Sequence, residues 1–256
     1  MQIIRYQTKN SQIQVGWVLE DQVGPIRGDI FGEFQRGELN TPLASVELLA
    51  PLKPGKIICV GRNYVAHAQE HGSDVPEIPL LFFKPPSSVI GPGEKIVLPP
   101  QSKQVEHEAE LAVVIGKRGY WISLENAVDH ILGYTIANDV TARDLQRSDL
   151  LWTRAKGFDT FCPLGPWIET NFDSSDALIN CHVNGELRQM ASTRDMVFSI
   201  PQLITFASSI MTLEPGDILL TGTPAGVSPV MPGDVIEVKI EGIGILKNPV
   251  VARNPR

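Results

Sequence analysis

Short apolar runs separated by turn residues dominate the chain. They stand at residues 3–6, 14–19, 56–60, 80–83, 96–98, 111–115, 134–137, 218–220 and 235–239. Most of these runs are brief and rich in Val and Ile, which is typical of strands. The 22 glycines and 20 prolines supply turns between them. The pattern therefore predicts a β-rich fold.

Three windows carry helical signals instead. Residues 65–71 contain several helix formers before a glycine and two prolines interrupt the chain. Ser123 is a suitable N-cap for a helix over residues 124–131, and Ser199 is one for a helix over residues 200–210. We expect these helices to be short and to lie between strands.

The apolar pattern is interrupted near residue 53 by Pro51-Leu52-Lys53-Pro54-Gly55. We predict a small N-terminal β domain over residues 1–53 and a main domain over residues 54–256. A chain of 256 residues is long enough for a main domain with a small appendage.

Composition and charge argue against several classes of function. The net charge of −7 gives no basic surface for nucleic acid, and no basic run indicates a membrane surface. No stretch approaches the roughly 20 apolar residues of a membrane span, and the first residues lack the apolar core of a signal peptide. Cys59, Cys162 and Cys181 show no zinc or disulfide spacing, so we expect a reduced, cytoplasmic setting.

The strongest chemical signal is the run Glu106-His107-Glu108-Ala109-Glu110, which leads directly into an apolar strand. If the strand extends back through the run, the three carboxylates point to one face at a spacing of about 7 Å. Two unit charges so placed repel by roughly 2.4 kcal/mol at an effective dielectric near 20. Protons, basic side chains or a hard cation such as Mg²⁺, Mn²⁺ or Ca²⁺ would compensate. The alternative is a frayed strand end with solvated charges.

Two further charged residues could contribute to such a site. Asp139 follows the strand at residues 134–137, where a carboxylate can join a metal site built on a neighbouring strand; the alternative is a helix N-cap or an Asx-turn. Lys156 could hold a substrate carboxylate or stabilise an enolate. The alternative for Lys156 is an exposed loop lysine.

A possible general base lies in the first helical window. His67 and Glu70 are three residues apart and share a helix face, so the carboxylate could orient the imidazole. The alternative is a pair on a solvated surface. Residues 221–227 form a glycine-bearing loop whose backbone donors could cradle an anion, although they do not form a P-loop. An ordinary strand connection is the alternative there.

Taken together, these segments resemble the fumarylacetoacetate hydrolase family. The resemblance runs from about residue 54 to the C-terminus, with the motifs in family order, and makes residues 54–256 a catalytic domain of this type. The motifs that carry it are ICVGRNYVAHAQEH (58–71), LFFKPPSSVIGPG (81–93), VEHEAELAVVIGKR (105–118), GYTIANDVTARDLQ (133–146), WTRAKGFDTFCPLGP (152–166), VNGELRQ (183–189) and DILLTGTPAGV (217–227).

The resemblance implies a site with one divalent ion, Mg²⁺ or Mn²⁺, in each subunit. By motif, Glu108, Glu110 and Asp139 match the metal ligands, whereas Glu106 has no ligand counterpart. His67 and Glu70 match a catalytic dyad on a lid, and Lys156 matches the lysine beside the metal. The segments that line the substrate site contribute Arg62, Gln146, Thr223 and, as a supporting residue, Arg143.

The resemblance also implies a fold and an assembly. The fold is mixed α/β and β-rich: a rolled β-sandwich like the C-terminal domain of the family, with short helices and a small N-terminal β appendage. Members are generally homodimers.

The expected substrate is a small 2-oxo acid. We expect cleavage of a carbon–carbon bond in an acylpyruvate or fumarylpyruvate through a metal-stabilised enolate. The same enolate serves an oxaloacetate or 5-oxopent-3-ene-1,2,5-tricarboxylate decarboxylase and a 2-hydroxyhepta-2,4-diene-1,7-dioate isomerase. Arg62, Arg143 or Arg147 could meet a second substrate carboxylate. A non-catalytic homologue that binds a metal or ligand is the alternative from another class.

Overall fold

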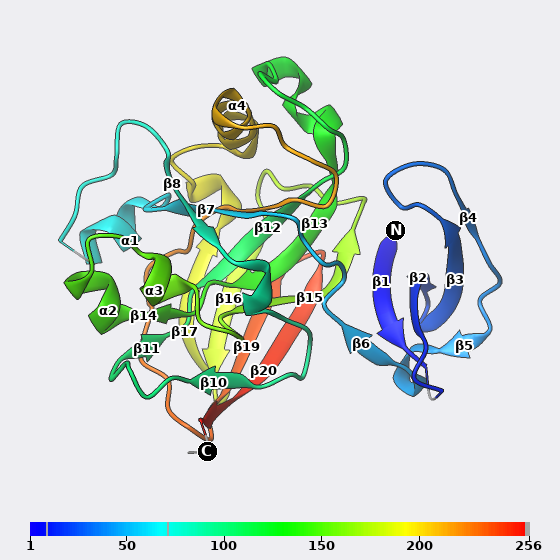
Figure 1. The fold of residues 1–256 in the computed structure, drawn as a ribbon, viewed down its shortest axis with the longest axis horizontal. Helices are drawn as coiled ribbons and strands as arrows, with labels where there is room; N and C mark the ends of the chain where they lie inside the picture. The colour runs from blue at the N-terminus through cyan, green and yellow to red at the C-terminus, as the bar shows by residue number, and fades with distance from the viewer. Residues whose placement is uncertain (9, 71, 254–256) are drawn as a thin grey trace.

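The computed structural model describes residues 1–8, 10–70 and 72–253. His71, at the end of the predicted helix over residues 65–71, lies outside the described residues. The described chain is β-rich with short helices, as predicted, and Figure 1 shows the N-terminal strands beside a larger body of strands. Within these residues no helix combines the length and apolar character needed to cross a membrane.

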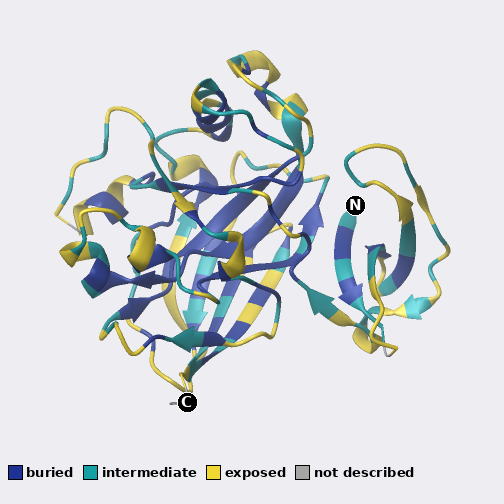
Figure 2. Ribbon diagram, viewed as in Figure 1, coloured by how far each residue is buried: buried dark blue, intermediate teal, exposed yellow. Residues whose placement is uncertain are grey.

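The larger sheet is built around β12 (Ala109–Ile115), every residue of which is buried. Its antiparallel neighbours are β13 (Ile131–Asn138) and β18 (Ile218–Leu220), and β7 (Ile57–Gly61) runs parallel to β18. β8 (Leu80–Lys84) pairs with β7, and β15 (Cys162–Glu169) pairs with β13. Figure 2 shows the central strands buried, and their position explains why these runs lack polar alternation.

A second, five-stranded sheet packs against the first. Its order is β10 (Ile96–Leu98), β20 (Gly244–Ala252), β19 (Val235–Ile240), β16 (Leu178–Val183) and β17 (Glu186–Ser192). Leu111 of β12 shares one apolar core with Ile179 of β16 and Val238 of β19. The two sheets thus form the expected sandwich.

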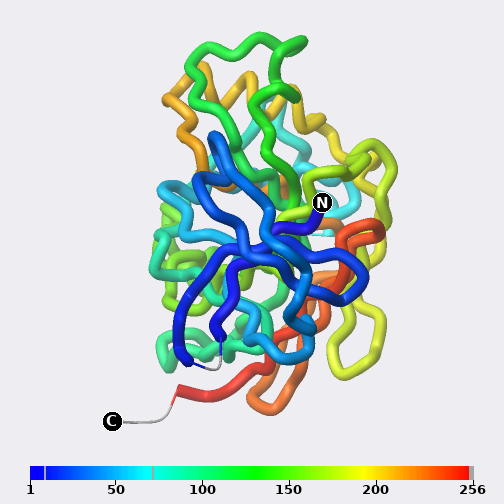
Figure 3. Tube along the Cα trace, turned by 90° about the vertical axis from the view of Figure 1, so that its right-hand side faces the viewer, coloured from blue at the N-terminus to red at the C-terminus, as the bar shows by residue number. Residues whose placement is uncertain are grey.

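The N-terminal strands continue the larger sheet. They are β1 (Gln2–Gln7), β2 (Ile13–Leu19), β3 (Gln22–Gly28), β4 (Phe34–Arg36), β5 (Thr41–Pro42) and β6 (Glu47–Leu49). β1 pairs with β15 through Gln2 and Ile3, opposite Glu169 and Ile168. Figure 3, viewed from this side, shows the N-terminal strands lying across the front of the molecule. The predicted boundary at residue 53 therefore does not interrupt the sheet.

Short helices connect the strands. The predicted helices correspond to α1 (Val65–Glu70), η3 (Leu124–His130) and α4 (Ile200–Ile210), and η3 is a 3₁₀ helix rather than an α-helix. Ser199 and Gln202 form a capping box at the start of α4. The remaining short elements are α2 (Arg143–Ser148), α3 (Thr153–Lys156), η1 (Leu43–Ser45), η2 (Pro86–Ser88), η4 (Thr193–Asp195) and β9 (Val89–Ile90).

The acidic run does not form one continuous strand, so the single-strand arrangement considered from the sequence is not the one observed. β11 (Val105–Glu106) ends at Glu106 and pairs with β14 (Thr141–Ala142), whereas β12 begins at Ala109 and pairs with β13. Between them, the Glu108 backbone N–H donates to the Asn138 side chain at 2.9 Å instead of to a strand partner. Glu106 therefore does not share a strand face with Glu108 and Glu110.

Candidate metal centre and active site

Three carboxylates from two antiparallel strands meet at one end of the larger sheet. Glu108 immediately precedes β12, Glu110 is the second residue of β12, and Asp139 follows the end of β13. Because Ala109 pairs with Asn138, the register brings the acidic ends together. All three residues are buried, and each offers an oxygen that lies within 4.8 Å of the others. A frayed strand end with solvated charges, the alternative considered from the sequence, is therefore wrong.

Two buried lysines neutralise part of this charge. The Lys156 ammonium donates to Glu108 at 2.6 Å and to Asp139 at 2.7 Å. Lys84, the last residue of β8, donates to the other Asp139 oxygen at 2.6 Å. Burial alone would lower the pKa of Lys156, but Asp139 and Glu108 raise it above its usual value. Lys156 is thus an internal cation and not an exposed loop lysine.

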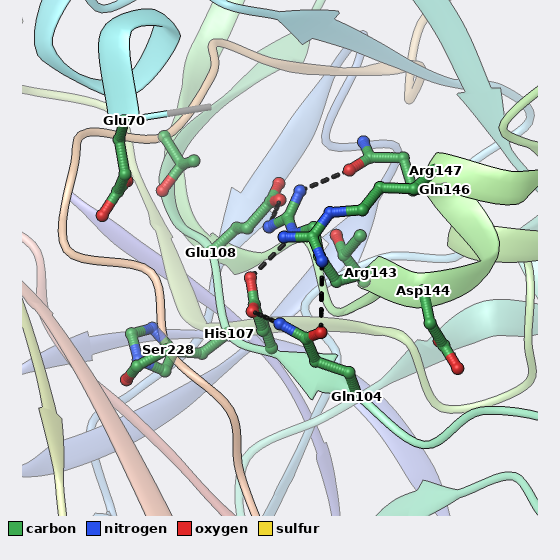
Figure 4. Close-up of polar contacts among 12 residues, drawn as sticks. Glu70, Gln104, His107, Glu108, Arg143, Asp144, Gln146, Arg147 and Ser228 are labelled. Atoms are coloured by element: carbon green, nitrogen blue, oxygen red, sulfur yellow. Dashed lines mark hydrogen bonds and ion pairs between the residues drawn. The ribbon is translucent and has the colours of Figure 1, made fainter. Parts of the chain in front are cut away.

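Arg143, the first residue of α2, connects Glu106 to the site. Its Nε donates to Glu106 at 2.7 Å, its Nη2 donates to Glu108, and its Nη1 donates to Gln146. Figure 4 shows its side chain lying beside Glu108. Glu106 is consequently a buried partner of Arg143 and not a solvated flanking charge. A charge-assisted network of this kind fixes the direction of the Glu108 carboxylate.

Glu110 differs from the other two carboxylates in its partners. It accepts a hydrogen bond from the Gly222 backbone at 2.7 Å, and no Lys or Arg among the described residues forms an ion pair with it. Burial, together with the charges of Asp139 and Glu108, raises the pKa of Glu110 well above its usual range. Burial also opposes ionisation of Glu108, but Lys156 and Arg143 outweigh it and lower the pKa of that carboxyl.

The donor set fits a hard divalent cation. Glu106, Glu108, Glu110 and Asp139 are four buried carboxylates facing three buried Lys and Arg groups, which leaves one negative charge in excess. The excess falls on Glu110. A cation beside the three ligand oxygens would balance it, and oxygen ligands of this kind suit Mg²⁺ or Mn²⁺.

The predicted dyad, His67 and Glu70, lies on α1, and His67 lines the same cavity as the three carboxylates. His67 is 7% exposed, and its Nδ1 lies 3.4 Å from a Glu70 oxygen. Glu70 also accepts a hydrogen bond from the Gly226 backbone at 3.1 Å, which ties α1 to the loop after β18. His67 is therefore buried rather than part of a solvated surface pair.

A cavity of about 240 Å³ brings most of the predicted residues together. Its lining includes every predicted site residue except Glu70. Phe82 and Trp152 form an apolar wall, with their rings edge to face at 5.1 Å between centroids. The Lys156 ammonium also lies 5.1 Å from the centre of the Phe82 ring. The cavity thus combines oxygen ligands, a fixed cation, an imidazole and an apolar side.

Three residues predicted to contact substrate, Arg143, Gln146 and Thr223, already have hydrogen bonds within the protein. The Arg143 guanidinium is occupied as described above. The Thr223 hydroxyl donates to the Ala109 carbonyl at 3.0 Å and accepts from Gln189 at 2.8 Å. Their substrate contacts remain predictions, as do those of Arg62. Arg62 has a backbone φ of +59°, a conformation that is often retained at functional sites.

Sequence reasoning missed Lys84 and Gln189. Lys84 lies within the motif LFFKPPSSVIGPG (81–93), but its burial depends on its partner Asp139, which is 55 positions away. Gln189 is fully buried and holds the loop that carries Thr223. The available signals were a lysine that ends an apolar strand and an amide at the end of VNGELRQ.

Two family models match nearly the whole chain. The fumarylacetoacetate (FAA) hydrolase C-terminal model matches residues 56–251. The chain belongs to the fumarylacetoacetate hydrolase family. A second model, Rv2993c-like N-terminal, matches residues 1–51 of this family member. The recognition made from the sequence motifs is therefore confirmed.

Relatives of this family member have several activities. Oxaloacetate tautomerase FAHD2B, mitochondrial, from Bos taurus is 47% identical over 223 residues, covering 82% of this chain and 71% of the relative. The crystal structure of 2-hydroxyhepta-2,4-diene-1,7-dioate isomerase from Mycobacterium marinum is 42% identical, with a TM-score of 0.91 and full coverage of both chains.

A third relative carries a metal ion in its structure. Maleylpyruvate hydrolase from Sphingobium sp. SYK-6, in complex with manganese(II) and pyruvate, is 33% identical. Its TM-score is 0.82, with 99% of this chain and 100% of that chain covered. This chain is thus an enzyme of a family that commonly binds a divalent metal, and it carries an acidic triad suited to one.

Proposed function

We propose that this enzyme is a divalent-metal-dependent tautomerase of dicarboxylic 2-oxo acids such as oxaloacetate. The reaction moves a proton from carbon 3 of the keto form and places one on the 2-oxo oxygen, giving the enol, or runs in reverse. The observation that carries the proposal is the Lys156 ammonium, buried between Glu108 and Asp139 in the cavity that His67 also lines.

The acidic triad and Lys156 provide the electrostatic part of the proposal. Glu108, Glu110 and Asp139 would hold Mg²⁺ or Mn²⁺, which supplies a Lewis acid for a carbonyl oxygen when bound. Negative charge develops on the 2-oxo oxygen as carbon 3 loses its proton. Lys156 stabilises that charge, because its ammonium is held in place by two carboxylates and needs little reorganisation.

His67 provides the proton transfer. It is the histidine that lines the cavity, and Glu70 lies beside its Nδ1, so the carboxylate can orient the ring while the imidazole exchanges a proton with carbon 3. The apolar wall of Phe82 and Trp152 limits water around the reacting carbon.

The second carboxylate of the substrate would be held by Arg62 or Arg147. Both line the same cavity. The Arg143 guanidinium is not assigned this contact, because it already binds two glutamates. The bovine relative named as an oxaloacetate tautomerase supports a dicarboxylic substrate.

Acylpyruvate hydrolysis is the second candidate function. An imidazole paired with a carboxylate, as in His67 and Glu70, suits activation of water against a distal carbonyl. The maleylpyruvate hydrolase relative supports this candidate. Hydrolysis differs from tautomerisation in its products, because it releases pyruvate.

The decisive experiment measures the rate at which enol-oxaloacetate absorbance is lost in a buffer that contains Mg²⁺. The blank is the same buffer without enzyme, because Mg²⁺ alone can change the absorbance. We expect catalysis that is abolished by exhaustive chelation and by Glu110→Gln. His67→Asn should lower kcat by roughly 100- to 10,000-fold, the usual contribution of a general base. His130→Asn is the matched control, because His130 lies in η3 and does not line the cavity.

Two results would contradict the proposal. Full turnover after chelation would show that the reaction needs no metal. Full turnover by His67→Asn would show that His67 is not the general base. In parallel, acetylpyruvate is supplied and pyruvate release is measured with lactate dehydrogenase. Rapid pyruvate release without enol-oxaloacetate turnover would favour the hydrolase instead.

A further inference from the structure

Gln189 is a buried amide in a strand that is otherwise largely exposed. β17 lies at the edge of the second sheet, and its neighbours Leu187 and Met190 are 50% and 61% exposed, whereas Gln189 is 0% exposed. The pairing with β16 shifts register here: His182 faces Leu187 but Cys181 faces Gln189, so Arg188 is an extra residue. This bulge turns Gln189 toward the interior, a device that often occurs beside active sites.

All four hydrogen-bonding positions of the Gln189 amide are filled. Its Oε1 accepts from His107 Nδ1 at 2.9 Å and from the Ala109 backbone at 3.1 Å. Its Nε2 donates to the Thr223 hydroxyl at 2.8 Å and to the Pro224 carbonyl at 2.7 Å. A glutamine side chain offers two acceptor positions and two donors, so this amide is fully satisfied.

Two of these partners belong to the chain around Glu108. His107 and Ala109 flank Glu108 directly in the chain, at the break between β11 and β12. His107 turns away from Glu108 toward Ser228, as Figure 4 shows, and its Nε2 accepts from that hydroxyl at 2.9 Å. Gln189 thereby holds the backbone at the point where Glu108 leaves the regular strand.

The other two partners belong to the loop that positions Glu110. Gly222, next to Thr223, donates its backbone N–H to Glu110. The Thr223 hydroxyl donates in turn to the Ala109 carbonyl. A shift of this loop relative to β12 would therefore move Glu110 relative to Glu108.

We propose that Gln189 is a positioning residue of the metal centre, whose amide locks the backbone around Glu108 to the loop at residues 222–224 and so sets the separation of the two glutamates. The inference rests on the proposed function, because it takes the triad as the metal site. Gln189 does not line the cavity. It acts through the residues that it holds, as partners behind metal ligands commonly do.

The test measures Mn²⁺ affinity by isothermal titration calorimetry in Gln189→Met, which keeps the length of the side chain and removes all four hydrogen bonds. We expect the dissociation constant to rise by about 10- to 100-fold. Gln189→Glu is a second variant that retains an acceptor for Ala109 but places an oxygen against the Pro224 carbonyl. It should bind Mn²⁺ at least about 10-fold more weakly than the parent.

Asn248→Leu is the matched control for the loss of a buried amide. Asn248 is 2% exposed, donates to the Gly91 and Glu94 carbonyls at 2.9 Å each, and does not line the cavity. It should lose stability but keep the parent's Mn²⁺ affinity, all proteins being titrated under conditions where circular dichroism shows them folded.

The possible results separate the two proposals. Parental Mn²⁺ affinity in both Gln189 variants would overturn the assignment of Gln189 and leave the proposed function intact. The same loss of affinity in Asn248→Leu would also overturn it, because a general loss of stability would then explain the effect. If the parent itself bound no Mn²⁺, the proposed function would fall first and this inference with it.

Discussion

At the scale of single residues, Lys84 shows how the site carries buried charge. Its side chain is 0% exposed, and its ammonium donates to Asp139 and to the Val140 carbonyl. A buried ion pair is costly to form, but removing one partner is more damaging because the other charge is left uncompensated. Lys84 binds one oxygen of Asp139 and Lys156 binds the other, so each lysine is needed to compensate this carboxylate.

Lys84→Met should lower the free energy of unfolding by about 3–5 kcal/mol in a chelator, measured by urea denaturation. The double variant Lys84→Met/Asp139→Asn should recover part of this loss, because the uncompensated charge is gone. Arg118→Met is the control: its ion pair with Glu214 is largely exposed and should contribute less than about 1 kcal/mol. Equal losses in Lys84→Met and Arg118→Met would rule out this role for Lys84.

The sequence identified some of these residues and not others for a physical reason. Glu108, Glu110 and Asp139 stand in motifs whose order is visible in one chain, so their meeting could be predicted. Lys84 could not be assigned, because local composition does not indicate whether a lysine at a strand end turns inward. Gln189 was hidden in the same way, since its direction depends on a register shift opposite Cys181.

At the scale of elements, the loop after β18 depends on one glycine. Gly226 has a φ of +99°, and a Cβ there would lie 2.0 Å from the Arg188 carbonyl oxygen in the bulge of β17. Its N–H also donates to Glu70 of α1. Three elements thus converge on a position that no side chain can occupy without displacing backbone.

Gly226→Ala should be much more damaging than Gly233→Ala. Gly233 has nearly the same φ, +100°, but no atom within 4 Å of its Cβ position, so it reports conformational strain alone, about 1–2 kcal/mol. The clash at Gly226 should add about 1–3 kcal/mol in urea denaturation. The Gly226 variant should also lose kcat/KM, whereas the Gly233 variant keeps it. Indistinguishable behaviour of the two variants would show that the contact with Arg188 is unimportant.

Periodicity predicted the regular elements and failed where pairing partners decide. The apolar runs of β7, β8 and β12 and the cap of α4 could be found locally, because burial and capping leave their mark on adjacent residues. The break at His107 could not, since the run itself is compatible with a continuous strand. It arises because β11 pairs with β14 while β12 pairs with β13.

At the scale of the whole molecule, the sheet extends from the N-terminal strands to the catalytic part. Ile3 lies opposite Ile168 and belongs to the same apolar cluster as Leu164 and Ile168 of β15. The Met1 ammonium lies 2.6 Å from Glu169, at the end of that strand. The break in composition near residue 53 gave no information about this pairing, because strands far apart in sequence form it.

We therefore predict that the N-terminal strands and the catalytic part unfold together. Ile3→Ala should lower the free energy of unfolding by about 2–5 kcal/mol, because Ile3 is fully buried. Ile13→Ala, in β2 and 54% exposed, should change it by only about 0.5 kcal/mol. Urea denaturation is followed by circular dichroism and by hydrogen exchange of peptides from β12 and β13. If the two parts unfold together, Ile3→Ala lowers both the urea midpoint seen by circular dichroism and the exchange protection of β12 and β13. Unchanged protection of β12 and β13 would instead show that the N-terminal strands unfold on their own.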